Sequence, residues 1–134
     1  MEVQIKMENE KGKIGIGNKE AMKLKPRKVK ILGYRIEMQK DRNKTKDIGE
    51  KVIFIVRHPE KESNIEISSV SYEKLDEINT VGTWFKLDED GKIMKGSALA
   101  SMLTFIDASN LDDTVGKEME TKADDKGYLV LKAY

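Results

Sequence analysis

The stretch 27–39 constrains the fold more than any other, because its alternation of apolar and polar residues changes phase midway. Val29 and Ile31 alternate with charged residues, the period-two pattern of a strand with one buried face. Beyond Gly33 the apolar residues fall instead at positions 34, 36 and 38. An inserted residue at Gly33 would keep both sets on one face, since a β-bulge adds one residue and glycine tolerates unusual dihedrals. The stretch therefore predicts a long strand, bent at Gly33, in a curled sheet.

Other apolar stretches predict a mostly β chain with one short helix. Residues 51–57 are β-branched and aromatic, as in a buried strand, and residues 65–72 form a third strand. Ser97 is expected to cap a helix, because apolar side chains follow it at i, i+3, i+4 and i+7 spacing. Residues 115–121 and 128–134 predict two closing strands joined by a tight turn.

Three segments between these elements are expected to form a loop, an irregular segment and a hairpin. Residues 40–50 are polar and basic, and predict a long exposed loop. Residues 73–82 predict an irregular segment with room for one helical turn. Residues 84–94 predict a hairpin, because an Asp-Gly pair favours a tight turn between its apolar ends.

The chain is expected to divide into residues 1–26, an N-terminal extension or edge hairpin, and residues 27–134, a single domain. A chain of 134 residues is long enough to bury roughly two-thirds of its unfolded surface. The apolar residues that alternate in the first segment are Val3, Ile5, Met7, Ile14 and Ile16.

Charge is unevenly distributed along a chain whose net charge is only +1. Residues 1–51 hold 15 lysines and arginines against 8 acidic residues, and residues 52–134 hold 10 against 16. The window 23–46 is the extreme, with 10 basic residues and two acidic ones. This asymmetry indicates either a basic stripe that meets polyanions or a solvated face whose counter-charges come from the acidic half. The sequence leaves both interpretations open.

Several classes of protein lack their characteristic residues here. The chain has no cysteine, which excludes disulfides, thiolate metal sites and cysteine catalysis. No stretch has the composition of a secretion signal or a membrane-spanning helix, so a soluble cytoplasmic protein without membrane contact is expected.

Three short motifs resemble catalytic or cofactor motifs, and each is incomplete. His58 follows Arg57 as in histidine phosphatases, but it is the only histidine and Pro59 replaces a glycine, so it is expected at the surface. Asp88–Ile93 resembles a calcium loop without the carboxylates of its first and twelfth positions. Gly15-Ile16-Gly17 lacks the third glycine of a dinucleotide-binding loop. No catalytic residue, metal or cofactor is expected, and the chain is predicted not to be an enzyme.

The order of the predicted elements is three strands, a short helix and two strands, with a glycine inside the long first strand. This order resembles the OB-fold, a five-stranded Greek-key barrel. The closing half, with Val115-Gly116-Lys117 and a final strand that begins Gly-Tyr, also resembles small single-stranded-DNA-binding proteins of phages and archaea. The resemblance covers residues 27–134 and implies an OB-like barrel with an extra N-terminal segment and an inserted hairpin.

In that fold, ligands bind on the face of the second and third strands and at the loops after the first and fourth strands. The resemblance therefore implies non-catalytic binding of single-stranded nucleic acid, with DNA as the first candidate. Cations would contact phosphates and rings would stack on bases. The turn at 124–127 is acidic, which argues against a clamp formed by both loops. Strand parity places Phe54 in the core and Arg57 outward. The residues expected to bind are Lys28, Lys30, Lys40, Arg42, Lys44, Lys46, Arg57, Tyr72 and Trp84.

An alternative from another class is a protein–protein interaction or assembly module, whose exposed strands pair with a partner or with a second copy. The basic amino-terminal half of one copy would then dock on the acidic half of another. Salt-dependent self-association without affinity for oligonucleotides would distinguish this function from nucleic-acid binding.

Overall fold

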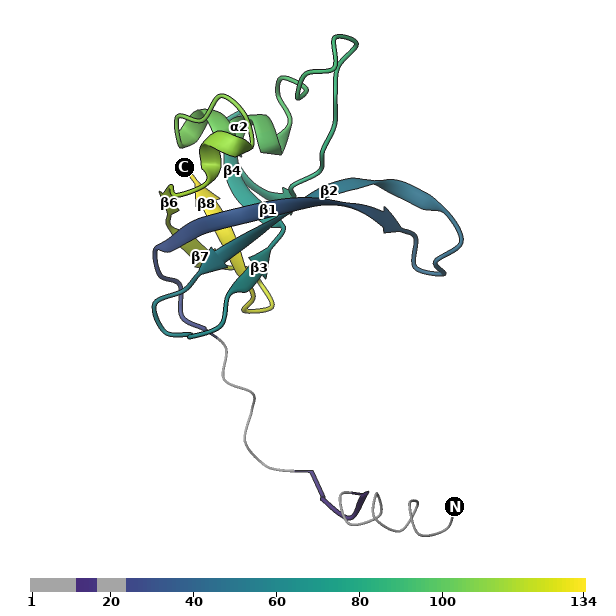
Figure 1. Cartoon of the computed structure of the whole chain (residues 1–134), viewed down its shortest axis with the longest axis vertical. Coiled ribbons are helices and arrows are strands. Elements are labelled where there is room, and N and C mark those ends of the chain that lie inside the picture. The colour runs from purple at the N-terminus through teal and green to yellow at the C-terminus, as the bar shows by residue number, and fades with distance from the viewer. Residues whose placement is uncertain (1–11, 17–23) are drawn as a thin grey trace.

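The computed structural model describes residues 12–16 and 24–134 of the chain. As the sequence predicts, the described part is mostly β with one short helix. In chain order its elements are β1 (Val29–Lys40), β2 (Asp47–Arg57), β3 (Ile65–Ile67), β4 (Ser69–Lys74), β5 (Glu77–Gly82), α2 (Ala98–Phe105), the 3-10 turn η1 (Asp112–Thr114), β6 (Glu118–Met119), β7 (Thr121–Ala123) and β8 (Leu129–Ala133). They form two four-stranded sheets, ordered β3-β2-β1-β6 and β5-β4-β8-β7 (Figure 1).

The predicted bend in the first strand is confirmed as a β-bulge. Ile31 pairs with Val56, whereas Gly33 pairs with Ile55, so Leu32 is the extra residue and the register shifts beside Gly33. Directly opposed residues share a face of the sheet. The apolar sets before and after the bulge therefore share one face of the ribbon, although Ile36 and Met38 lie beyond the core and are exposed. The antiparallel β1–β2 ribbon curls the first sheet into a half-barrel.

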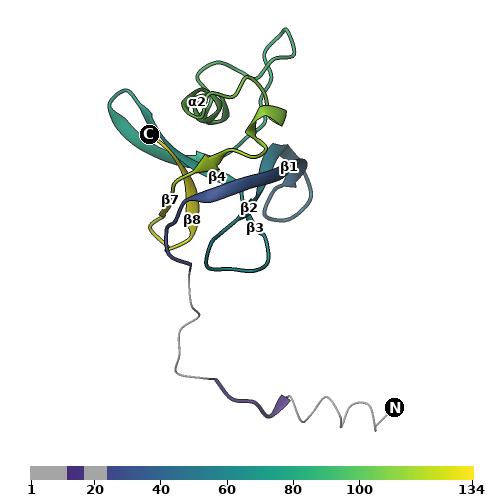
Figure 2. The same ribbon diagram turned by 60° about the vertical axis from the view of Figure 1, so that its left-hand side comes forward.

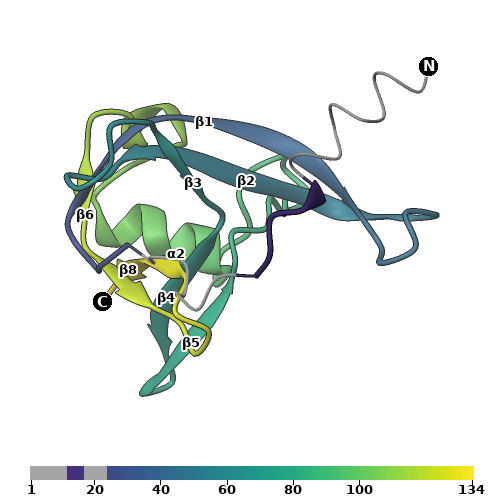
Figure 3. The same cartoon turned by 90° about the horizontal axis from the view of Figure 1, so that it is seen from below.

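The core lies between this half-barrel, the second sheet and α2. Phe54 is fully buried together with the other inward residues of β2, which confirms the predicted parity, and Arg57 is exposed. The Ser97 hydroxyl accepts a hydrogen bond from the Ala100 N–H at 3.1 Å, which confirms the predicted helix cap. The helix α2 packs against β4 and β8, with the β1–β2 ribbon on its other side (Figures 2 and 3).

The described strands do not form one closed five-stranded barrel, because two of the five predicted strands are interrupted. The third predicted strand breaks at Ser68, so that β3 belongs to the first sheet and β4 to the second. The fourth breaks at Glu120, which separates β6 from β7 in the same way. Two sheets joined by short connections therefore replace one continuous barrel.

Thr83 explains the break at Ser68. Its N–H donates to the Ser68 carbonyl at 2.9 Å, and its carbonyl accepts from the Val52 N–H at 2.8 Å. The Thr83 hydroxyl donates to the Val52 carbonyl at 2.6 Å. This fully buried threonine occupies the edge of β2 that the third strand would need in order to continue beside it. The strand is consequently redirected into the second sheet.

The prediction of an irregular segment over 73–82 is also wrong. This segment forms most of the β4–β5 hairpin, with Lys74 opposite Glu77 and a two-residue turn between them. The turn residues Leu75 and Asp76 have φ of 52° and 65°, as such hairpin turns require. Leucine rarely adopts this conformation, so the turn carries no recognisable sequence signal.

The predicted exposed loop at 40–50 is shorter than expected, because β1 and β2 extend into it and leave only residues 41–46 outside the strands. The distal part of the β1–β2 ribbon projects from the body (Figure 1). We call residues 37–50 the arm. Residues 84–94 double back as predicted, but they are held by a single bridge between Leu87 and Ile93 rather than by two strands.

His58 attaches the residues before β1 to the first sheet. Its side chain is only 1% exposed, so the expectation of a surface histidine is wrong. Nδ1 accepts a hydrogen bond from the Glu60 N–H at 3.0 Å, which leaves Nε2–H to donate to the Lys25 carbonyl at 2.7 Å. Of the residues expected to form an N-terminal edge hairpin, Val3, Ile5 and Met7 lie outside the described part. Ile14 and Ile16 are exposed and belong to no strand.

We predict that His58→Phe lowers the free energy of unfolding by about 1–3 kcal/mol, because the ring is replaced without its two hydrogen bonds. Urea denaturation measures this change. The matched control is Arg57→Ala, the exposed neighbour, which should stay within about 0.5 kcal/mol of the parent chain. Equal effects of the two substitutions would contradict the structural role of His58.

Candidate nucleic-acid interface

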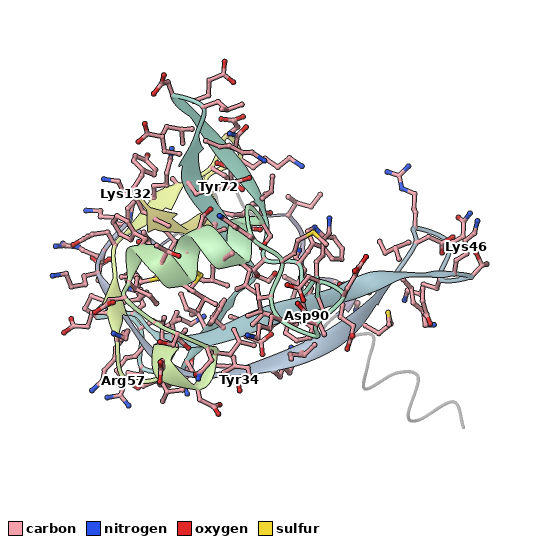
Figure 4. All side chains as sticks on the ribbon, turned by 90° about the horizontal axis from the view of Figure 1, so that it is seen from above. Tyr34, Lys46, Arg57, Tyr72, Asp90 and Lys132 are labelled. Carbon is pink, nitrogen blue, oxygen red and sulfur yellow. The ribbon has the colours of Figure 1, made fainter. Side chains whose placement is uncertain are left out.

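The cations predicted from residues 23–46 do not form one continuous stripe in the described structure. Lys30 lies opposite Arg57 at the start of β1, whereas Lys40 lies opposite Asp47 at its far end. Lys30 and Lys40 are ten residues apart along this strand, or at most about 33 Å. Figure 4 shows Arg57 and Lys46 at opposite ends of the molecule. The cations at the two ends of β1 therefore form two separate groups.

Some of these cations are already paired with acidic residues. Lys40 donates to Asp47 at 2.6 Å, and Lys28 lies 3.8 Å from Glu120. Exposed pairs of this kind are weak, but each reduces the local positive charge. The cations among the predicted binding residues that make no ion pair within the described chain are Lys30, Arg42, Lys44, Lys46 and Arg57.

The loop at the end of the arm has a defined backbone. The Asp41 carboxylate accepts hydrogen bonds from the Thr45 N–H at 2.7 Å and the Thr45 hydroxyl at 2.9 Å. It also accepts from the Lys46 N–H at 3.3 Å. These bonds, the Thr45 bonds foremost, hold the pKa of Asp41 below its ordinary value. The loop therefore exposes its unpaired cations from a fixed conformation.

The outward face of β2 and β3, where the resemblance implies a ligand, carries no aromatic side chain from these two strands. Arg35 crosses this face from β1 and binds Glu66 with two hydrogen bonds of 2.5 and 2.9 Å. The pairing lowers the pKa of Glu66 and raises that of Arg35. A ring reaches this face only at the base of β2, where Trp84 is bridged to Lys51 in the described structure.

Trp84 lies at the base of the arm. A Cβ added at Gly49 would stand 3.6 Å from the indole ring, so the ring packs against the backbone of the arm. The Lys51 ammonium lies 5.3 Å from the centroid of the same ring, in cation–π geometry. Trp84 is held at this place because it forms a β-bridge with Lys51 and follows Thr83, which is hydrogen-bonded to Val52 of β2.

Tyr72 and Trp84 line a common cavity of about 330 Å³, which we call the first chamber. Lys74 and Lys86 also line it, and no acidic residue of the described chain does. Tyr72 is mainly a core residue, 7% exposed. Its hydroxyl makes no hydrogen bond within the described chain, where no buried polar side-chain atom lacks a partner. The hydroxyl therefore reaches the solvent of the chamber.

The structure thus brings together two of the predicted binding residues, Tyr72 and Trp84, at one cavity, and Trp84 also contacts the arm. Figure 4 shows Tyr72 apart from both Lys46 and Arg57. Sequence reasoning missed the lysines around the two rings, Lys51, Lys74 and Lys86. Lys74 and Lys86 each follow one of the rings by two positions, so sequence proximity could have indicated them, whereas Lys51 reaches Trp84 only through the bridge between the two residues.

A separate apolar groove of about 810 Å³ lies between β1, the 85–93 segment and α2. Ile36 and Leu87 line it and are largely exposed, 38% and 46%. At its rim the Tyr34 hydroxyl donates to the Asp112 carboxylate at 2.5 Å, which raises the pKa of Tyr34. This bond attaches η1 to β1.

Comparisons of the chain with protein-family models, with curated proteins and with solved structures found no match. The OB-fold resemblance therefore depends on the order of elements alone. Within residues 12–16 and 24–134, no three histidine or acidic side chains are grouped so as to hold a metal ion. In the same part of the chain, no helix is long and apolar enough to cross a membrane.

We predict that the Thr45 amide resonance titrates with a midpoint below the ordinary aspartate value of about 3.9. The folded-state pKa of Asp41 is lowered, so its contribution to the loop is present above the unfolded-state pKa and is lost as the pH falls through the folded one. An NMR titration measures the midpoint. Asp41→Asn should abolish the transition, and a midpoint above the ordinary value would contradict the bonding described.

Proposed function

We propose that this protein binds single-stranded nucleic acid without catalysis, with DNA as the first candidate. The observation that carries the proposal is the position of Trp84, between the basic arm and a chamber lined by Tyr72 and lysines. Non-specific strand binding needs cations that follow phosphates and rings that stack on bases. This region supplies both within a short distance.

The arm provides the phosphate contacts in this proposal. Arg42, Lys44 and Lys46 are exposed and make no ion pair within the described chain. Gly49, against which Trp84 packs, is three residues from Lys46, or about 10 Å along a strand. A single nucleic-acid strand bound along the arm would thus reach Trp84 within a few nucleotides.

The first chamber provides the base contacts. Its volume of about 330 Å³ falls in the range of small-ligand sites, roughly 300–1,000 Å³. A base stacked on Trp84 would lie close to the Tyr72 hydroxyl, a free donor and acceptor. Lys74 and Lys86 would neutralise the phosphates that flank it.

The finer fold assignment belongs to the same proposal. Single residues separate β3 from β4 and β6 from β7, so each pair can be regarded as one interrupted strand. Three strands, a helix and two strands then follow one another, as in the OB-fold. The parallel pairing of β4 with β8 and the pairing of β1 with β6 support an OB-like barrel that is open at the two interruptions.

We predict that Trp84→Leu weakens binding of a single-stranded oligonucleotide by about 5- to 160-fold, because stacking contributes about 1–3 kcal/mol per base. Trp84→Phe should retain most of the affinity, since it keeps a ring. Fluorescence anisotropy measures both, with circular dichroism to verify folding. Absence of binding by the parent chain at low salt would refute the proposed function.

We predict that replacing Arg42, Lys44 and Lys46 together by glutamine reduces the slope of log affinity against log salt by about 2. Each phosphate contact on a single strand contributes about 0.7 to this slope through counterion release. Anisotropy titrations at several salt concentrations give the slope. The matched control is Lys30→Gln with Arg57→Gln, equally exposed but at the far end of β1, which should leave the slope unchanged.

A protein–protein interaction or assembly module is the second candidate, and the apolar groove between β1 and the 85–93 segment favours it. Exposed apolar side chains that line a groove are typical of interaction sites. Light scattering with and without an oligonucleotide distinguishes the two candidates. Self-association without oligonucleotide binding would favour the module.

A further inference from the structure

The first chamber adjoins a second cavity, of about 520 Å³, which we call the second chamber. Both chambers are lined by Tyr72 and Gly96, so the two lie on either side of the tyrosine. Phe105 and Tyr134 line the second chamber. The two cavities together form one groove between the end of β4 and the helix α2.

One face of α2 runs along the whole groove. Ala98 lines the first chamber, and Ser101 and Phe105 line the second. These three positions follow at intervals of three and four residues, which places them on one side of a helix. Apart from Ala98, the helix buries a different set of side chains, and Phe105 remains 52% exposed at its end. A large ring is therefore presented to the groove rather than to the core.

The second chamber differs from the first in charge. Lys95 lines it, and Glu73 is the one acidic residue of the described chain that does, whereas two lysines and no acidic residue of the described chain line the first. Tyr134 also lines the second chamber and is contacted by two lysines that do not. The Lys132 and Lys122 ammonium groups lie 4.9 and 5.5 Å from its ring centroid, and Lys122 donates to its hydroxyl at 3.1 Å.

We propose that the second chamber is a second base-binding site, which receives a later base of the strand whose earlier base stacks on Trp84. The strand passes over Tyr72, and its base stacks on the exposed ring of Phe105. Lys95 contacts a phosphate on this side. This inference rests on the proposed function and extends it, because it makes the ligand a run of successive nucleotides rather than a single stacked base.

Photocrosslinking tests the arrangement directly. A set of 12-nucleotide strands, each with 5-iodouracil at a different position, is bound to the whole chain and irradiated. We expect crosslinks at Trp84 from one position of the 5-iodouracil, and at Phe105 or Tyr134 from another. The number of nucleotides between these two positions should be small and the same in every strand. Crosslinks at Trp84 alone would overturn the second site and leave the proposed function intact. No binding of any strand would refute both.

Affinity measurements on variants of Phe105 give a second test. Phe105→Leu should weaken binding of the 12-nucleotide strand by about 5- to 160-fold, whereas Phe105→Tyr should retain the affinity, because a ring is what stacks. The matched control is Val115→Ala, an exposed apolar residue that lines neither chamber. Unchanged affinity for Phe105→Leu, in a chain that still binds and loses affinity with Trp84→Leu, would overturn the second site alone.

Discussion

The extra residue Leu32 divides β1 into a part that pairs on both edges and a part that pairs on one edge only within the described structure. Before the bulge, β1 pairs on both edges: with β2 on one side and with β6 and the segment before it on the other. Ile31 exchanges backbone hydrogen bonds of 2.9 and 2.7 Å with Lys117 and Gly116. Beyond the bulge the second edge of β1 pairs with no described strand, and the ribbon continues outward as the arm. The bulge therefore separates a strand held in the body from a strand that projects from it.

The junction at Thr83 connects this geometry to the candidate site. Because Thr83 bonds to the backbone of Val52, the next residue along the chain is held against Lys51, at the base of the arm. The same junction sends the third strand into the second sheet, where β4 carries Tyr72 toward α2. A single buried threonine thus fixes the interruption of the barrel and the meeting of two rings. The fold and the groove depend on the same contacts.

The features that the sequence predicted correctly are local. The phase change at Gly33, the parity that buries Phe54 and the cap at Ser97 each depend on residues a few positions apart. The features that it missed depend on distant partners. Thr83 bonds to a residue 31 positions away, and His58 to one 33 positions away. The β4–β5 turn was missed because a leucine with positive φ replaces the usual glycine or asparagine.

The candidate site shows the same division. Tyr72 and Trp84 were identifiable as aromatic residues, and Lys74 and Lys86 follow them by two positions, but Lys51 comes to Trp84 only through strand pairing. The described cations of this window differ in whether an acidic residue pairs with them. Near the start of β1, the solvated-face interpretation applies to Lys28, which pairs with Glu120 from the acidic half. At the arm, the only carboxylate within the loop is Asp41, and its hydrogen bonds go to the loop's own backbone and to Thr45. A count of charges over residues 23–46 combines cations from both ends of a long β-strand. Pairing with acidic residues across the sheet determines which of these cations are available to a polyanion.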